Sequence, residues 1–131
     1  MTKVTHQLLL SIGSNSSPEE NIVRAEVLLH DSFPDIAFTQ RIRTEAIGKR
    51  GPMYLNELAR ASTFLSYEKV NDILKNIEQQ LGRVHHHPKG LVTIDIDILR
   101  LDEQIYHEAD WGRPYVQRLL QQPFHLSSYQ Y

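Results

Sequence analysis

The sequence predicts an α+β fold in which two helices pack against an antiparallel sheet. Three observations lead to this prediction: segments with the two-residue alternation of strands, two segments with the apolar spacing of amphipathic helices, and their order along the chain, β-α-β-β-α-β. Strands and helices in this order are typical of a two-layer domain. The chain has 131 residues, so we treat residues 1–131 as a single domain.

The first half of the pattern begins with a buried strand and a helix. Residues 7–12 form an apolar run that predicts the strand. Ser17 is expected to cap the helix, with Pro18 at its first position and Glu20 completing a capping box. The helix should end near Asp31, because its apolar residues stop there after recurring at helical spacing: Ile22, Ala25 and Leu29.

Two strands and a second helix follow. Residues 36–43 and 53–64 are predicted as strands, separated by a glycine-rich loop at residues 48–52. Ser66 is expected to cap the second helix, and Gly82 to end it as a left-handed residue. One apolar stripe predicts which face of this helix is buried: Val70, Ile73, Leu74, Ile77 and Leu81.

The last predicted strand covers residues 93–99, after a loop at residues 85–90. Alternation divides it into an apolar face (Ile94, Ile96 and Ile98) and a polar face (Thr93, Asp95 and Asp97). The completed order is that of a ferredoxin-like sandwich, with both helices on one face of the sheet. Beyond it the chain is polar, and a short helix is expected at residues 115–120.

Composition excludes several classes of protein. The chain is 40% hydrophobic and 23% charged, which is typical of a globular domain and not of a disordered one. It has no cysteine, so disulfides and thiolate sites are excluded, and its net charge of −2 argues against a broad nucleic-acid surface. Since no apolar run suits a membrane span or signal peptide, we expect a cytoplasmic protein. We also expect a monomer or weak homodimer.

The polar face of the last strand is the most informative feature for function. Asp95 and Asp97 lie two residues apart, which places them about 6.5–7 Å apart along a strand. Such a pair can bind a hard cation such as Mg²⁺ and leave coordination positions open for phosphate. Glu78, near the edge of the second helix's apolar stripe, and Arg83, just after that helix, would suit phosphate chemistry nearby.

Each of these features also has a structural interpretation. The two aspartates can be the solvated face of a strand, Glu78 a solvated helix residue, and Arg83 a charge that complements the helix C-terminus. Residues 13–15 (Gly-Ser-Asn) can cradle an anion or simply form a tight turn. The three histidines at residues 85–87 can bind zinc weakly, but they have no evident partner at ligand spacing.

Four motifs occur in register: Ile12–Asn15, Tyr54–Asn56, Ile77–Val84 and Thr93–Leu99. Together they resemble the 6-hydroxymethyl-7,8-dihydropterin pyrophosphokinase family of folate biosynthesis, of which this chain looks like a shortened and divergent member. The resemblance covers about the first hundred residues. It implies a ferredoxin-like fold and transfer of pyrophosphate from ATP to the hydroxymethyl oxygen of a reduced pterin, with release of AMP.

The resemblance also implies a role for each matching position. Asp95 and Asp97 would hold two Mg²⁺ ions, and Asp97 would help to remove the pterin hydroxyl proton. The implied catalytic residues are Asp97, Arg83 and Arg113. The pterin would be bound by Thr44, Tyr54, Asn56 and Tyr115, with Glu78 in the supporting polar shell. The phosphates of ATP would be contacted by Arg83, His85, Lys89 and Arg113.

Departures from the family pattern leave two hypotheses open. Val92 stands where the family usually has an arginine, the usual tryptophan before the last strand is absent, and a Val-Pro-His-Pro segment has no counterpart. Either the protein is an active enzyme in which nearby loop cations replace the arginine, or it is a non-catalytic paralogue that binds a pterin or nucleotide. The candidate cations are Lys49, Arg50, His85, His86, His87 and Lys89.

Overall fold

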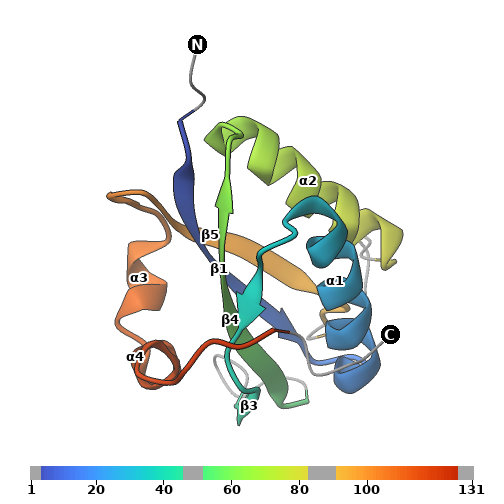
Figure 1. The fold of residues 1–131 in the computed structure, drawn as a ribbon. Helices are drawn as coiled ribbons and strands as arrows, with labels where there is room; N and C mark the ends of the chain where they lie inside the picture. Colours follow the sequence, from blue (N-terminus) through green and yellow to red (C-terminus); the bar gives the residue numbers. More distant parts are fainter. Residues whose placement is uncertain (1–3, 46–51, 83–90, 127–131) are drawn as a thin grey trace.

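The protein folds into one antiparallel sheet with helices on both of its faces (Figure 1). A computed structural model describes residues 4–45, 52–82 and 91–126. Its elements in chain order are β1 (His6–Ser14), α1 (Pro18–Ser32), β2 (Ala37–Phe38), β3 (Ile42–Thr44), β4 (Tyr54–Thr63), α2 (Tyr67–Gln80), β5 (Asp95–Leu101), β6 (Gln104–Ile105), α3 (Glu108–Trp111) and α4 (Pro114–Leu120).

The strand order confirms the predicted ferredoxin-like fold. Among the described residues the sheet has six strands in the order β2-β4-β1-β5-β6, with β3 also paired to β4. Every pairing is antiparallel. The central strand β1 therefore lies between β4 and β5, which brings the Asp-bearing strand next to the first strand of the chain.

The predicted second strand, residues 36–43, is wrong as a single element. The structure has two short strands there, β2 and β3, and both pair with β4. Thr39 lies between them, and its hydroxyl oxygen accepts the backbone N–H of Leu58 at 2.9 Å. Because a side chain replaces a backbone carbonyl at this rung, the regular ladder is interrupted and resumes at Ile42.

The two helix starts differ in how they are capped. The predicted capping box at Ser17 is wrong: Ser17 is left-handed (φ 42°) and its side chain makes no capping bond. A capping serine normally has extended backbone, which aims its oxygen at the first free amides. Ser66 does so, with φ −72° and ψ 167°, and accepts from Lys69 N. The predicted left-handed glycine is confirmed at Gly82 (φ 91°).

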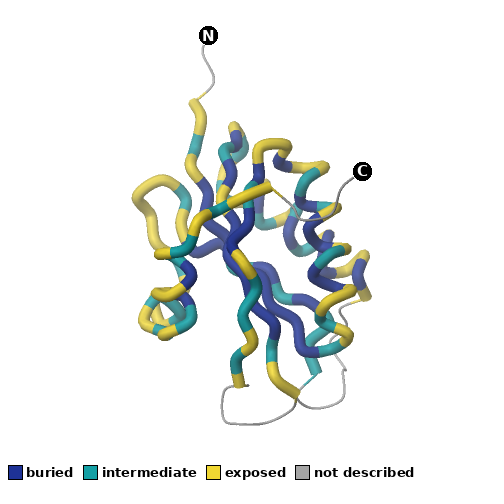
Figure 2. Tube along the Cα trace, turned by 60° about the horizontal axis from the view of Figure 1, so that its bottom comes forward, coloured by how far each residue is buried: buried dark blue, intermediate teal, exposed yellow. Residues whose placement is uncertain are grey.

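Two apolar cores lie on opposite faces of the sheet. The larger packs α1 and α2 against β1, β4 and the predicted apolar face of β5, where Ile94, Ile96 and Ile98 are at most 2% exposed. Figure 2 shows the buried positions along the strands. The smaller core lies under α4, the short helix expected near residues 115–120. It consists of Leu9, Leu58, Leu99, Val116 and Leu119.

A charged cluster is buried in the larger core, between α1 and β4. Glu26 and Glu57 are 2% and 1% exposed. Arg41 binds both carboxylates: its Nη2 is 3.1 Å from Oε2 of Glu26 and its Nε is 3.4 Å from Oε1 of Glu57. Burial, and then the negative charge of Glu26, raise the pKa of Glu57 well above its usual range. The positive charge of Arg41 opposes this rise in the pKa of Glu57. Its two ion pairs also join the β2–β3 connection to α1 and β4.

No helix in the described part of the chain is long and apolar enough to cross a membrane.

Candidate active site

A cavity of about 390 Å³ opens on the face of the sheet that α4 covers only in part. Its volume lies in the range of small-molecule sites. It is lined by Ser11, Ile12, Gly13, Thr44, Glu45, Tyr54, Asn56, Asp95, Asp97, Asp110, Arg113, Pro114 and Tyr115. The lining thus comes from β1, β3, β4, β5, α3 and the start of α4, so segments far apart in the sequence meet here.

The two aspartates reach this cavity because of the alternation in β5. Asp95 pairs with Gly13 of β1 and Asp97 pairs with Ser11. The register between β1 and β5 then shifts, so that Leu99 has no direct partner in β1. A bulge of this kind re-aims the side chains beyond it. Leu99, two residues after Asp97, lies on the same face of the sheet as the aspartates and joins the core under α4. The shift instead changes the side to which Arg100 and Leu101 point, so that Arg100 lies opposite Leu9 and Leu101 packs against the larger core.

The electrostatics of the aspartate pair favour a bound cation. Burial, and then the charge of Asp95, raise the pKa of Asp97 to about 6, although His107 and Lys75 oppose the shift. The described residues include no group of three or more side chains suited to hold a metal. The pair nevertheless fits Mg²⁺, which commonly binds one or two carboxylates and takes its other oxygens from water and substrate phosphates.

This shift predicts a pH-dependent stability in metal-free buffer. Since the pKa of Asp97 is raised from 3.8 to about 6, the native state holds this proton more tightly than the unfolded state, and stability falls as the pH rises through this range. The Asp97→Asn variant should therefore gain up to about 3 kcal/mol over wild type at pH 8 and almost nothing at pH 3.5. Paired urea titrations at both pH values measure the difference, and an equal gain at both would contradict the assignment.

A polar subsite lies on the neighbouring strands. Asn56 is 7% exposed and donates from Nδ2 to the hydroxyl of Thr44 at 2.7 Å. It faces Gly13 across the β1–β4 ladder. An amide held in this way keeps one N–H and its carbonyl oxygen for a ligand. Tyr54 and Tyr115 add aromatic surface to the same cavity.

Gly13 is required for this arrangement. A β carbon at this position would lie 2.9 Å from Oδ1 of Asn56, closer than side chains tolerate. The Gly13→Ala variant should displace the Asn56 amide and weaken about tenfold the binding of the pterin that the family resemblance implies, the effect of losing one hydrogen bond. Gly112→Ala is the matched control, because its nearest new neighbour is 3.9 Å away. Fluorescence titration with 6-hydroxymethylpterin measures both, and equal affinities would contradict the prediction.

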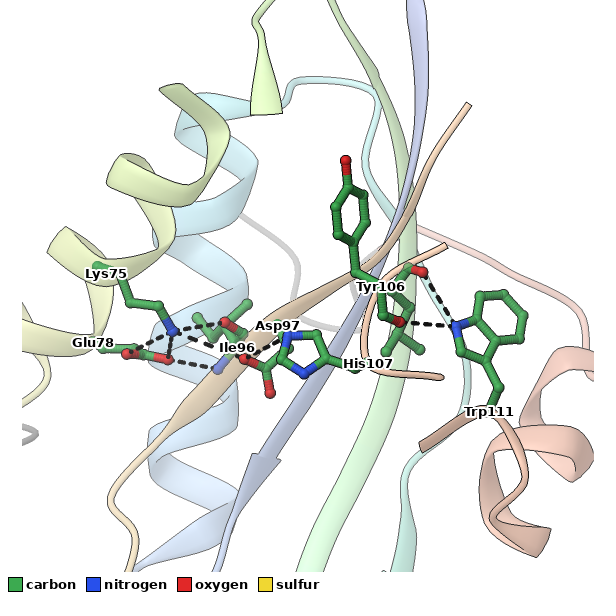
Figure 3. A network of polar contacts seen from close by, with 8 residues as sticks. Lys75, Glu78, Ile96, Asp97, Tyr106, His107 and Trp111 are labelled. Atoms are coloured by element: carbon green, nitrogen blue, oxygen red, sulfur yellow. Dashed lines mark hydrogen bonds and ion pairs between the residues drawn. The ribbon is translucent and has the colours of Figure 1, made fainter. Parts of the chain in front are cut away.

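The segment before α4 is anchored to the end of β5. Trp111 donates from Nε1 to the carbonyl oxygens of Leu99 and Tyr106, at 3.2 and 3.1 Å. This anchor brings His107 to Asp97, with Nε2 3.8 Å from Oδ1 (Figure 3). It also places Arg113 at the cavity, where its Nε donates to Asp110 at 2.9 Å.

On the side toward α2, the edge of β5 is covered by side chains. Oε2 of Glu78 accepts the backbone N–H of Ile96 at 2.8 Å. The ammonium of Lys75 lies 3.3 Å from both Glu78 carboxylate oxygens and 3.5 Å from the carbonyl oxygen of Ile96. It is also 3.8 Å from Oδ1 of Asp97. Lys75 and His107 therefore approach Asp97 from α2 and from the segment before α3 (Figure 3).

The turn after β1 holds the segment that leads into β5. Asn15 donates its backbone N–H to the carbonyl oxygen of Val92 at 3.0 Å, and its Oδ1 accepts the N–H of Val92 at 2.6 Å. The backbone amide of Asn15 is thus used within the chain, as in the tight-turn interpretation of residues 13–15.

The structure brings most of the predicted site residues together. Those that line the cavity are Thr44, Tyr54, Asn56, Asp95, Asp97, Arg113 and Tyr115. Glu78 lies behind β5 and contacts its backbone. Arg83, His85 and Lys89 fall outside the described residues, as do the other candidate loop cations, Lys49, Arg50, His86 and His87.

Sequence reasoning missed Lys75, His107 and Asp110. Lys75 precedes Glu78 by three residues, and this spacing on one helix face could have pointed to it. His107 had no local signal, because tertiary contacts bring it to β5: the backbone N–H of Tyr106 donates to the carbonyl oxygen of Leu99 at 2.9 Å, and Trp111 donates to the same oxygen.

The fold and the cavity define an α+β, ferredoxin-like domain with an acidic small-molecule pocket on the open part of its sheet. Residues 9–123 match the sequence model of 7,8-dihydro-6-hydroxymethylpterin-pyrophosphokinase (HPPK). This match spans most of the chain, so the protein belongs to the HPPK family, a family of pterin pyrophosphokinases of folate biosynthesis.

Proposed function

We propose that this protein is an active, ATP- and Mg²⁺-dependent pyrophosphokinase that converts 6-hydroxymethyl-7,8-dihydropterin and ATP into the pterin diphosphate and AMP. The observation that carries this proposal is the presence of the aspartate pair and the Asn56–Thr44 subsite in one cavity. The cavity therefore offers the aspartates for metal-bound phosphates and the Asn56–Thr44 subsite for a pterin ring, so ATP and the pterin can bind side by side.

In the proposed reaction the hydroxymethyl oxygen attacks the β-phosphorus of ATP. A new bond forms between the pterin oxygen and the β-phosphorus. The bond from the β-phosphorus to the oxygen that bridges it to the α-phosphorus breaks, and AMP leaves with that electron pair. Asp97 accepts the hydroxyl proton. Mg²⁺ held by Asp95 and Asp97 would neutralise the polyphosphate and orient it for in-line attack.

The remaining residues bind and position the substrates in this proposal. Asn56 hydrogen-bonds the pterin edge, and Tyr54 and Tyr115 pack on its ring. Arg113 contacts phosphate, and Asp110 orients its guanidinium through the 2.9 Å bond. Glu78 supports the site from behind β5. Phosphate contacts from Arg83, His85 and Lys89 complete the proposed set.

The charge of the cavity favours one alternative, a non-catalytic paralogue that binds a pterin or nucleotide. Four carboxylates line the cavity (Glu45, Asp95, Asp97 and Asp110), and the cation among the lining residues is Arg113. A polyphosphate is attracted to such a site only when metal ions and further cations offset the carboxylates.

AMP production distinguishes the two functions. The purified protein is incubated with ATP and Mg²⁺, with and without 6-hydroxymethyl-7,8-dihydropterin, and AMP is measured by chromatography. Pterin-dependent AMP establishes the pyrophosphokinase. Folded protein that binds the pterin but forms no AMP would overturn the catalytic proposal in favour of the binding paralogue.

A further inference from the structure

We propose that Lys75 is a phosphate-binding residue of this site, which supplies positive charge to the nucleotide from the α2 side of Asp97. The inference rests on the proposed function, because it concerns the same ATP-binding end of the cavity. It assigns a role to a side chain that lies on a helix behind the sheet and that the sequence pattern did not single out.

The first argument is the balance of charge. The four lining carboxylates repel a nucleotide triphosphate, and Arg113, the lining cation, already donates to Asp110. Lys75 and His107 are the cations within 4 Å of Asp97 in the described residues. Of these two, Lys75 carries its ammonium on a flexible four-carbon stem with three rotatable donors, which suits it to contact a phosphate.

The second argument is the loose geometry of the ammonium. Its distances to Glu78, Ile96 and Asp97 are 3.3, 3.5 and 3.8 Å, all longer than the 2.7–2.9 Å usual for a charge-assisted bond. The side chain is also 44% exposed, whereas that of Glu78 is 5% exposed. Lys75 is thus shared among weak contacts and is able to turn toward an incoming anion.

The third argument is access to the edge of β5. The strand β6 pairs with β5 at Arg100 and Leu101, beyond the aspartates. Within residues 4–45, 52–82 and 91–126, the α2 side of β5 near Asp97 is therefore covered by side chains and not by a strand, and Lys75 reaches around this edge (Figure 3). A phosphate that extends past Asp97 toward this edge meets the ammonium.

A purely structural role for Lys75 is the alternative, since its charge neutralises the buried Glu78 carboxylate. The two roles predict different results. A phosphate ligand affects nucleotide affinity alone, whereas a structural residue affects the geometry of β5 and therefore pterin and metal binding as well.

Three substitutions and one control test the proposal. Lys75→Gln removes the charge but keeps an N–H donor for Glu78 and Ile96, Lys75→Met removes both, and Lys75→Arg keeps the charge. Lys69→Met is the control, because Lys69 is an exposed lysine on the same helix. Calorimetry with α,β-methylene-ATP and Mg²⁺ measures nucleotide binding. Fluorescence with 6-hydroxymethylpterin and paramagnetic resonance with Mn²⁺ measure the other two ligands.

We expect Lys75→Gln and Lys75→Met to bind the nucleotide analogue at least about tenfold more weakly, the effect of losing a hydrogen bond to a charged group. Their pterin affinity should be unchanged and their Mn²⁺ affinity no weaker than that of wild type. Lys75→Arg should stay within about threefold of wild type, and Lys69→Met should match it.

Unchanged nucleotide affinity in both neutral variants would overturn the proposal, and so would a parallel loss of all three ligands. If wild-type protein binds Mn²⁺ and pterin but no nucleotide, the proposed function fails first and the role of Lys75 fails with it. This result differs from a failure of Lys75 alone, in which wild type and variants bind the nucleotide equally.

Discussion

The Asp97→Ala variant is expected to form pterin-dependent AMP at least about a thousandfold more slowly than wild type. Metal ions contribute several kcal/mol to transition-state stabilisation in phosphoryl transfer, and each 1.36 kcal/mol changes the rate tenfold. Removal of Asp97 takes away one of the two carboxylates that face the cavity from β5. It should also abolish Mg²⁺-dependent nucleotide binding, which calorimetry measures alongside AMP formation.

Asp72→Ala is a suitable control, because Asp72 is an exposed carboxylate on α2 outside the cavity lining. It should keep full activity and full nucleotide affinity. Metal-dependent nucleotide binding that survives in folded Asp97→Ala protein would count against the assignment of the metal site to this pair.

The Arg41→Met variant is expected to lose about 3 kcal/mol of stability at pH 8, the cost of breaking a buried ion pair. Arg41 faces two carboxylates, Glu26 and Glu57, that are almost completely buried. Without the guanidinium the pKa of Glu57 rises further, so the native state binds its proton over a wider range and stability falls as the pH rises. The loss should therefore be smaller at pH 5 than at pH 8, as measured by urea unfolding.

Arg43→Met is the matched control two residues away. Arg43 also pairs with a glutamate, Glu19, but the two side chains are 55% and 60% exposed. Exposed pairs contribute little, so this variant should unfold at the same urea concentration as wild type. A similar loss of unfolding free energy in both variants would show that replacing an arginine anywhere in this segment has this effect, and would contradict the role of the buried charges.

Much of the fold was predictable because its signals are local. The alternation of Ile94, Ile96 and Ile98 with Asp95 and Asp97 requires only that one face of a strand be buried, and the structure confirms that burial. The interruption of the second strand was not predictable, since it depends on a bond from Thr39 to a residue on another strand.

The site was predictable only in its chemistry. Residue types and the family resemblance pointed to Asn56 and the aspartates, but not to the contact between Asn56 and Gly13, which the β1–β4 register creates. Lys75 and His107 escaped prediction for the same reason, because packing of α2 and of Trp111 determines where they lie. A buried glutamate such as Glu57, in an otherwise strand-like segment, likewise reveals its partners only in three dimensions.

The contacts at the edge of β5 also affect whether a strand from another molecule can add to the sheet. An uncovered strand margin is a template on which a second molecule can add a strand and begin aggregation. Here the backbone groups of Ile96 are already bonded to Glu78 and Lys75. An added strand would displace the Glu78 carboxylate, which is 4% exposed, from the N–H of Ile96 and so remove a hydrogen bond from a buried charged group. Because side chains already bond the backbone of this edge, the strand that carries the aspartate pair resists fibril-like growth from that side.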